Sequence, residues 1–388
     1  MPERPNVILI CVDQMRYDCL SIAGHPAVET PFLDHLAHQG VRFTNAHTGV
    51  ASCIAARAAL MTGMTQRNHG RVGYSDAVPW TYDRTLAGEM TRAGYQTVSV
   101  GKMHVHPQRN ALGFERVVLH DGMIHHYGRD RESDYEEWVL RECGPDRGLF
   151  DHGMPSNSWV ARPWHLPEYT HPTYWATSRA VEFLQNRDRS RPFFLFLSYV
   201  APHPPLVPPA FYLEQYLNQE LPEPPVGNWL GKFSFDPERT RWGHSSAAAR
   251  LDPRARHRCQ AGYYGLITQI DHQLGRLLEH CSDERALRDT VFLFISDHGE
   301  LLGDHHRFRK CVPYAGSVRV PMIACFPERY GHPQGITRHE LVELRDLMPT
   351  VLDAAGAPIP DTVDGRSLVP LAAGEQPEWR GHLHGEHW

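Results

Sequence analysis

The chain has 388 residues, of which 41% are hydrophobic and 22% charged, the composition of a globular protein and not of a low-complexity or collagen-like chain. Its net charge of −6 argues against a dedicated nucleic-acid-binding protein, which usually carries a basic domain, although a few focused cations could still bind a small anion. The longest apolar runs, residues 7–12 and 193–201, are much shorter than the roughly 18 residues of a membrane span, so we expect no membrane partner.

The N-terminus and the cysteines bear on location. The first residues, MPERPNVILICVD, run directly into a strand pattern and lack the basic region, apolar stretch and cleavage site of a secretory signal. The eight cysteines contain no CxxC pair, and several sit in apolar strand or helix patterns, as reduced thiols do. Both features predict a cytoplasmic protein; a periplasmic or secreted location would require a signal trimmed from the sequence.

Short apolar runs alternate with amphipathic stretches along the chain. Five of the runs predict buried strands: residues 6–13, 96–102, 192–200, 290–297 and 321–326. Three amphipathic stretches predict helices: residues 86–93, 259–281 and 338–355. Because the strands are apolar throughout, they fit a sheet that is covered on both faces. The alternation therefore predicts an α/β fold with a mostly parallel central sheet.

Two stretches lack clear periodicity, residues 105–172 and 202–256. Both are longer than ordinary connections, and insertions of this kind often cover a binding site. Five of their aromatic residues could line a pocket for an aryl group, a sugar or a quaternary amine: Tyr127, Trp159, Trp164, Trp229 and Trp242. For any one of them, packing within the loop is the commoner role.

Polar side chains follow four of the predicted strands at the point where each strand ends. They are Asp13-Gln14, Lys102 with His104, His203, and Asp297-His298. In open α/β sheets, ligands bind beyond the carboxyl ends of the strands. We therefore expect these side chains to converge on one crevice.

Two of these pairs form a donor set for a divalent cation. Asp13, Gln14 and Asp297 offer mainly hard oxygen ligands, which suit calcium, magnesium or manganese, and the imidazole of His298 also admits zinc. Either pair alone would more often cap a turn or a helix, but two pairs at strand ends favour a metal site. The neighbouring cluster at residues 304–306 is expected to be a solvated or hydrogen-bonded loop and not a set of ligands.

Cys53 opens an alanine-rich segment that predicts a helix ending near Gly63. The first turn of a helix favours negative charge, and Arg57 projects from the same face one turn later. A lone cysteine in such a segment is usually a small buried hydrophobic residue. Beside an arginine at a helix start, a nucleophile next to an anion site is an equally good interpretation.

Other candidate cations and proton carriers are less distinctive. Lys102 and His104 are two apart in an extended segment, so both point to the same side. His203 sits in a proline-stiffened loop, APHPP, and lone loop histidines are usually not catalytic. Lys310 lies in HRFRKCVPY, where two arginines leave open which basic residue acts.

In combination, these residues resemble the type I, formylglycine-dependent sulfatases of the alkaline-phosphatase-like superfamily. Cys53-Ile-Ala-Ala-Arg57 followed by Leu-Met-Thr-Gly is similar to their modification signature, Cys-x-(Pro/Ala)-x-Arg with a trailing Thr-Gly. The other blocks match in order: Asp13-Gln14, Gly101-Lys-Met-His104, His203, and Ser296-Asp-His-Gly299 with Lys310. The resemblance implies a large α/β catalytic domain over residues 1–375, with residues 376–388 as the start of a truncated or absent C-terminal subdomain.

The resemblance also implies a metal and a modified residue. Asp13, Gln14, Asp297 and His298 would bind one divalent cation, with Ca²⁺ the first choice and Mn²⁺, Mg²⁺ or Zn²⁺ as alternatives. An oxygen of formylglycine, which a formylglycine-generating maturation enzyme makes from Cys53, would complete the set of ligands.

By the same resemblance, Arg57 and Lys102 would steady the hydrated aldehyde while one of its hydroxyls attacks sulfur. His203 and Lys310 would bind the ester oxygens, and one of the two would protonate the departing alcohol. His104 would then help to remove a proton from the other hydroxyl, which expels sulfate and restores the aldehyde.

Two departures keep alternatives open. Ala55 stands where the motif more often has proline, and Gln14 stands where many members have a second aspartate, as it does in choline sulfatases and phosphonate monoester hydrolases. The favoured function is arylsulfatase-like hydrolysis of a small-molecule sulfate monoester. The alternatives are phosphonate monoester or phosphodiester hydrolysis at the same site, and a catalytically silent metal- and anion-binding homologue. The oligomeric state stays open.

Overall fold

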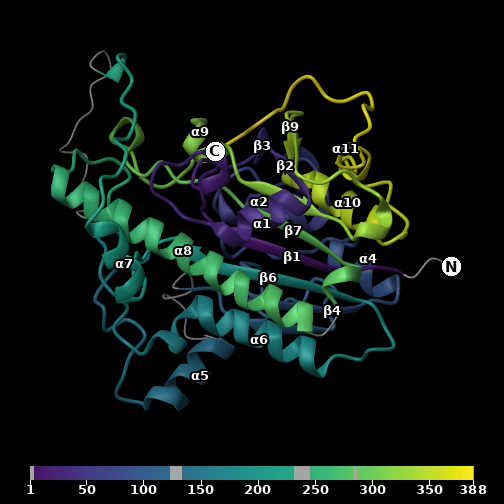
Figure 1. Cartoon of the computed structure of the whole chain (residues 1–388), viewed down its shortest axis with the longest axis horizontal. Coiled ribbons are helices and arrows are strands. Elements are labelled where there is room, and N and C mark those ends of the chain that lie inside the picture. The colour runs from purple at the N-terminus through teal and green to yellow at the C-terminus, as the bar shows by residue number, and fades with distance from the viewer. Residues whose placement is uncertain (1–3, 123–132, 231–244, 284–285, 388) are drawn as a thin grey trace.

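A central β-sheet organises the fold (Figure 1). The structure is a computed structural model and describes residues 4–122, 133–230, 245–283 and 286–387. Within these ranges the sheet has eight strands, in the order β5-β4-β6-β1-β7-β8-β2-β9. They are β1 (Asn6–Asp13), β2 (Val41–Phe43), β4 (Gln96–Gly101), β5 (Arg116–Leu119), β6 (Phe193–Pro202), β7 (Thr290–Ser296), β8 (Met322–Cys325) and β9 (Ile336–Arg338). Strand β8 runs antiparallel to β7 and β2, and the other neighbouring pairs are parallel. The predicted α/β fold with a mostly parallel sheet is confirmed.

The five predicted strands are confirmed as β1, β4, β6, β7 and β8. Several strands were not predicted because they are short or only partly buried; β5, for example, has one buried residue. Two further short strands, β3 (Ala46–His47) and β10 (Val342–Glu343), pair in parallel as a separate small sheet.

Helices cover both faces of the sheet. They are α1 (Pro31–Gln39), α2 (Cys53–Thr62), α3 (Gln66–His69), α4 (Leu86–Arg92), α5 (Asp134–Cys143), α6 (Pro172–Asn186), α7 (Ala210–Leu217), α8 (Pro253–Asp283), α9 (Ala315–Val318), α10 (Leu347–Ala354) and α11 (Val369–Ala372). Alternate side chains of β1 point into two cores. Ile8 and Ile10 pack in one core with α6 and α8, and Val7 and Leu9 in the other with α2, α4 and α10. Figure 1 accordingly shows α6 on one side of the strands and α10 on the other.

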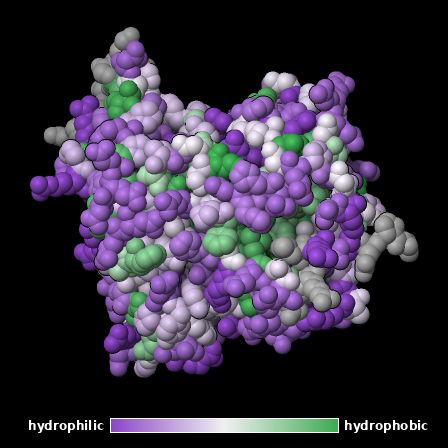
Figure 2. Space-filling view, viewed as in Figure 1, coloured by the Kyte–Doolittle hydropathy of each residue, from purple (hydrophilic) through white to green (hydrophobic). Residues whose placement is uncertain are grey.

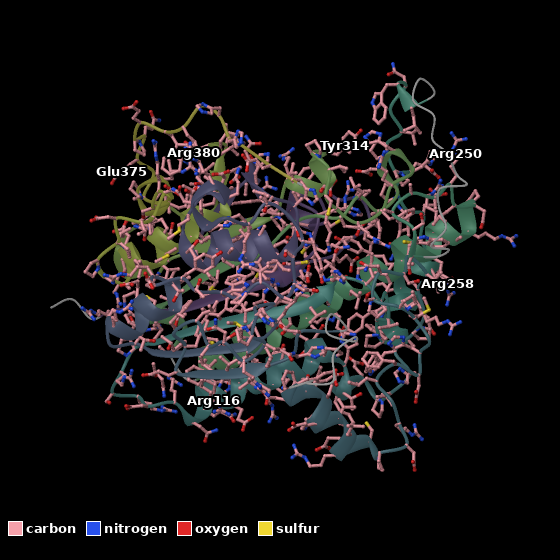
Figure 3. All side chains as sticks on the ribbon, turned by 180° about the vertical axis from the view of Figure 1, so that it is seen from behind. Arg116, Arg250, Arg258, Tyr314, Glu375 and Arg380 are labelled. Atoms are coloured by element: carbon pink, nitrogen blue, oxygen red, sulfur yellow. The ribbon has the colours of Figure 1, made fainter. Side chains whose placement is uncertain are left out.

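The outer surface is mostly hydrophilic on the face seen in Figure 2, where hydrophobic residues gather only in small patches. Seen from behind, Tyr314 lies between the C-terminal segment that carries Arg380 and the segment that carries Arg250 (Figure 3). No helix in the described part of the chain combines the length and the apolar character needed to cross a membrane.

Two of the three helix predictions are confirmed and one is half wrong. Residues 86–93 and 259–281 correspond to α4 and α8, although α8 begins earlier, at Pro253. The predicted helix over residues 338–355 forms only in its second half, as α10. Its first part pairs with β3 as β10 and then turns through a short 3₁₀ segment, where Asp346 accepts a hydrogen bond from the backbone N–H of Glu343. Pairing with a strand almost 300 residues earlier leaves no periodic signal in the local sequence.

The two stretches predicted to be irregular hold more structure than their composition indicates. Residues 105–172 contain β5 and α5, and residues 202–256 contain α7. Two of the five aromatic candidates, Tyr127 and Trp242, lie outside the described residues.

The strand ends converge because the parallel strands are in matching register. Asp13 of β1 lies opposite Pro202 of β6, and Val12 lies opposite Ser296 of β7. Gly101, the last residue of β4, pairs with Ser198 of β6. The residues that follow β1, β4, β6 and β7 therefore emerge at the same edge of the sheet.

The turn after β4 predicts a specific sensitivity. Gly101 has a φ of +99°, and a Cβ added there would overlap the backbone carbonyl oxygen of Ser198. Gly94 has a similar φ of +87°, but a Cβ added there would meet nothing within 4 Å. We expect Gly94→Ala to lower the free energy of unfolding by about 1–2 kcal/mol, the cost of a left-handed residue, and Gly101→Ala to lower it by several kcal/mol more. Equal losses in urea denaturation would contradict this account of the turn.

Candidate active site

Cys53 is the first residue of α2, as predicted. The helix forms because its sequence, CIAARAALMT, is rich in strong helix formers, and it ends at Gly63, which adopts the left-handed conformation with a φ of 67°. Almost all of its side chains are buried, and Cys53 itself is 2% exposed. The helix start therefore aims a buried sulfur at the carboxyl edge of the sheet.

Four potential ligands surround one point at this edge. Donor atoms of Asp13, Cys53, Asp297 and His298 all lie within 4.8 Å of one another, and all four residues are buried. The Nε2 atom of His298 is 3.0 Å from the Cys53 sulfur, 3.5 Å from Asp13 Oδ1 and 3.7 Å from Asp297 Oδ1. We call these four residues the ligand cluster.

The donor set fits a divalent cation. The Nδ1 atom of His298 lies 3.0 Å from the carbonyl oxygen of Gly299, which can only accept, so Nδ1 donates and Nε2 is the ring nitrogen that faces the cluster. Asp13 and Asp297 are fully buried, and burying two carboxylates together is costly unless positive charge compensates them. Carboxylate oxygens and one imidazole are ligands that Ca²⁺ or Mn²⁺ accepts.

Protein cations compensate part of this charge. Lys102 forms an ion pair with Asp13, and Arg57 Nε lies 3.0 Å from Asp297 Oδ2. Burial opposes ionisation of Asp13, but Lys102 and His203 hold its pKa well below the usual range. Burial and the neighbouring Asp13 instead raise the pKa of Asp297.

The Cys53 thiol is tuned toward its anion. Burial and Asp13 oppose its ionisation, yet Lys102, Lys310 and His298 together hold its pKa well below the ordinary value. Arg57 lies one helical turn further on, and its Nη1 donates to the carbonyl oxygen of Lys102 at 2.8 Å. The buried Nη2 of Arg57 has no hydrogen-bond partner among the described residues. Such an unpaired buried donor is expected where the oxygen of a substrate or of a modified residue binds.

Gln14 contacts the ligand cluster through its backbone N–H, which lies 3.1 Å from Asp297 Oδ1, and its side chain contacts Lys310. Lys310 Nζ donates to Gln14 Oε1, and its charge acts on Asp13, Cys53 and His298. The structure therefore brings Lys310 to the site.

Two predicted histidines, His203 and His104, are both buried but have different surroundings. Burial and the charge of Lys310 lower the pKa of His203 to about 3, and Asp13 and Cys53 also act on its ring. His104 is buried too, and its Nε2 lies 3.1 Å from Asp76 Oδ1. The ring of Tyr74 packs edge-on against His104, which follows Lys102, the partner of Asp13, by two residues.

The structure thus brings the predicted site residues to one region, while their individual roles stay predictions. The segment at residues 304–306 behaves as expected, because buried Asp304 accepts a hydrogen bond from Arg16 at 2.8 Å. Three polar residues were missed: Asp76, Ser198 and Glu300. Glu300 could have been found, since it follows the strand-end pair in the sequence SDHGE, but nothing local connects Asp76 with His104.

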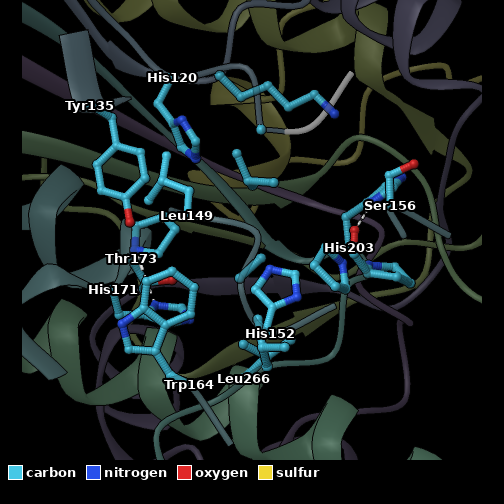
Figure 4. Close-up of a pocket in the computed structure, with 18 of the residues that line it drawn as sticks. His120, Tyr135, Leu149, His152, Ser156, Trp164, His171, Thr173, His203 and Leu266 are labelled. Carbon is cyan, nitrogen blue, oxygen red and sulfur yellow. Dashed lines mark hydrogen bonds between the residues drawn. The ribbon is translucent and has the colours of Figure 1, made fainter. Parts of the chain in front are cut away.

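A cavity with apolar and ring side chains in its wall is lined in part by Lys102 and His203 (Figure 4). Six of its ring side chains come from the 105–172 stretch: His120, Tyr135, Phe150, His152, Trp164 and His171. Burial lowers the pKa of His120 and His171 to about 3 and that of His152 to about 4, so all three rings are neutral near pH 7. Trp164 is the aromatic candidate that lines this cavity; Trp159 packs instead against Phe308, and Trp229 stacks on Tyr314.

Comparisons with known proteins agree with this site. The sulfatase family model matches residues 5–357. An arylsulfatase from Clostridium perfringens is 46% identical, over 99% of this chain and 82% of the relative. PehA, a multifunctional alkaline phosphatase superfamily protein from Trinickia caryophylli, is 32% identical, over 99% of this chain and 80% of the relative.

Solved structures show the same fold. The phosphonate monoester hydrolase of Agrobacterium radiobacter aligns with a TM-score of 0.81 at 27% identity, over 97% of this chain and 79% of that one. The match of the family model to most of the chain, and the 46% identity over 99% of this chain and 82% of the relative, show that this protein belongs to the sulfatase family.

Proposed function

We propose that this protein is an arylsulfatase-like hydrolase that cleaves a sulfate monoester into an alcohol and sulfate. The observation that carries the proposal is the position of Cys53, buried at a helix start within the ligand cluster and flanked by Arg57, Lys102 and Lys310. The 46% identity to an arylsulfatase supports sulfate as the group that is transferred.

In this proposal a divalent cation and the conversion of Cys53 to formylglycine complete the site. A divalent cation, for which Ca²⁺ is our first choice, would be held by Asp13, Gln14, Asp297 and His298. When present, the cation and a formylglycine derived from Cys53 supply a polarised, hydrated aldehyde as the nucleophile. The three oxygen donors at positions 13, 14 and 297 support a hard cation over zinc.

The residues around this nucleophile stabilise negative charge. Lys102 acts on Cys53 through its charge, and Nη2 of Arg57 is a buried donor without a partner among the described residues, so both can stabilise charge that builds up on the sulfate oxygens during the reaction. Because both side chains are buried and held by other contacts, they need little rearrangement when the ester arrives.

Lys310 is the better proton donor for the departing alcohol. The Nδ1 atom of His203 lies 2.7 Å from the carbonyl oxygen of Pro204 and donates to it, so the neutral ring presents Nε2 as an acceptor. Lys310 is half-buried, and an ammonium group is a donor through three N–H groups and accepts no hydrogen bond. His203 then lines the space beside the ester, and Lys310 transfers the proton to the alcohol oxygen as the bond between this oxygen and sulfur breaks.

The cavity beside His203 supports an aromatic alcohol. Among the described residues that line it there is no carboxylate, and its histidines are neutral, so a quaternary amine would find aromatic faces but no counter-charge. A flat, neutral ring matches the lining of Tyr135 and Trp164.

Phosphonate monoester hydrolysis is the second candidate. It is favoured by the structural likeness to the phosphonate monoester hydrolase and by the glutamine at position 14, where many family members have a second aspartate. Parallel assays of p-nitrophenyl sulfate and a phenyl phosphonate monoester would rank the two, and faster turnover of the phosphonate would overturn our order.

Loss of the nucleophile tests the proposal directly. We expect Cys53→Ala to lower kcat/KM for p-nitrophenyl sulfate by more than about a thousandfold, because no other group can take over the attack. Cys325→Ala, at the end of β8, serves as the matched control and should leave kcat/KM unchanged. Mass spectrometry of the Cys53 peptide should find the aldehyde. Thiol alone after co-expression with a maturation enzyme, without activity, would favour a catalytically silent protein.

The proton donor can be identified from leaving groups. In a series of aryl sulfates, we expect Lys310→Ala to slow esters of weakly acidic phenols by about a hundredfold or more and esters of acidic phenols much less. His203→Ala should slow the whole series by a similar factor. A steeper dependence on phenol pKa in His203→Ala than in Lys310→Ala would reverse the two roles.

Filling the cavity should change substrate choice. Ser156 lines the same cavity as His203 (Figure 4), whereas the next residue, Asn157, does not line it. We expect Ser156→Phe to raise KM for a two-ring aryl sulfate by about tenfold while KM for a small alkyl sulfate stays the same, because the added ring occupies the space of the alcohol. Asn157→Phe is the control. Equal effects of the two variants would place the alcohol elsewhere.

A further inference from the structure

Glu300 is a buried carboxylate with no position in the reaction described so far. It is 4% exposed and follows the Asp297-His298 pair after a single glycine. Its Oε1 accepts hydrogen bonds from the backbone N–H groups of Leu302, at 2.9 Å, and of Arg309. Its Oε2 accepts a hydrogen bond from Nε2 of Gln14.

The neighbours of Gln14 dictate which way its amide faces. An ionised carboxylate can only accept hydrogen bonds, and an ammonium can only donate them. Glu300 therefore requires the NH₂ group of Gln14 on its side, and Lys310, which donates to Oε1, requires the carbonyl oxygen on the other. Both contacts select the same one of the two amide orientations.

The selected orientation places the carbonyl oxygen of Gln14 on the side of Lys310 and away from Glu300. The ammonium of Lys310 that contacts Gln14 Oε1 also acts on Asp13, Cys53 and His298. A cation is bound by an amide oxygen and is repelled by an amide NH₂, so the orientation decides whether Gln14 can be a ligand.

The backbone of Gln14 cannot compensate by moving. Gln14 has a φ of 74°, and its N–H lies 3.1 Å from Asp297 Oδ1. Its carbonyl oxygen accepts a hydrogen bond from the hydroxyl of Tyr263 at 2.6 Å. Because the backbone N–H and the carbonyl oxygen of Gln14 are both held by hydrogen bonds, only the orientation of its side-chain amide can change.

We propose that Glu300 is a positioning residue that presents the carbonyl oxygen of Gln14, and not its NH₂ group, to the catalytic cation. The inference rests on the proposed function only in that a divalent ion binds the ligand cluster. It also explains how a neutral amide can stand at position 14: the negative charge that an aspartate would supply there sits one contact away, on Glu300.

The proposal makes an unusual prediction for Glu300→Gln. The new NH₂ group cannot replace Oε1, because two backbone N–H donors face that position. It must replace Oε2 and donate toward Gln14, so Gln14 has to turn its own oxygen away from the cluster. We expect Ca²⁺ affinity to fall by roughly 10- to 100-fold, the usual effect of losing a residue that orients a metal ligand.

The reciprocal exchange should restore binding. Gln14→Glu alone places a second buried carboxylate against Glu300, which is unfavourable. In the double variant Gln14→Glu/Glu300→Gln, the new amide at position 300 donates to the new carboxylate at position 14, and the other carboxylate oxygen faces the cation. The net charge is unchanged, and Ca²⁺ affinity should return to the wild-type value or exceed it.

The experiment is a calorimetric titration of the metal-free full chain with Ca²⁺ alone, for the wild type, both single variants and the double variant. Glu89→Gln, which changes another buried glutamate that is 8% exposed and pairs with Arg84 and Arg92, controls for the loss of a buried carboxylate. Circular dichroism in chelator verifies folding, and the double variant keeps the test valid if Glu300→Gln folds poorly.

Weakened binding in Glu300→Gln that the double variant restores supports the inference. Wild-type affinity in Glu300→Gln, or no recovery in the double variant, overturns it. A wild-type protein that binds no Ca²⁺ overturns it as well, together with the metal site. Normal Ca²⁺ behaviour in a protein that hydrolyses no sulfate ester overturns the proposed function and leaves the role of Glu300 standing.

Discussion

Two fully buried carboxylates, Asp13 and Asp297, stand side by side at the carboxyl edge of the sheet, and the site is organised around compensating their charge. Uncompensated, the pair would destabilise the fold, because the interior solvates charge poorly. Lys102 and Arg57 each neutralise one carboxylate, and His298 lies between them. The same positive charges that make the acids tolerable also lower the pKa of the Cys53 thiol.

The fold creates this arrangement through register. Parallel pairing of β1 with β6 and β7 brings the ends of three strands together at one edge of the sheet. The start of α2 places Cys53 at the same edge. None of the groups in the ligand cluster needs a flexible loop to reach its place. An active site assembled from strand ends and a helix start is rigid, which favours electrostatic stabilisation of a transition state.

Much of this could be read from the sequence because the signals were local. The central strands are continuous apolar runs, and Asp13, Lys102 and Asp297 follow them directly, so both the sheet and the convergence of polar residues were predictable. What could not be read depends on contacts between distant segments. The pairing of β10 with β3 replaced half of a predicted helix, and the contact between Asp76 and His104 joins two loops with no shared pattern.

Glu300 combines a local sequence signal with a contact between distant segments. Its position in SDHGE is visible in the sequence, but its partner is chosen by a tertiary contact with Gln14, which lies 286 residues away. Likewise, the aromatic residues of the 105–172 stretch were noticed, and yet only the fold shows that Trp164 lines the cavity beside His203 while Trp159 does not. Residue types were predictable here, and their pairing was not.

The account depends most on a cation that lies against residue 53 and between the two buried acids. Anomalous diffraction from crystals soaked in Mn²⁺ tests this position directly, because the signal locates the ion independently of any activity. The account predicts a single strong peak bound by Asp13, Asp297 and His298 and in contact with residue 53. A peak elsewhere, with the ligand cluster left without an ion, would contradict it.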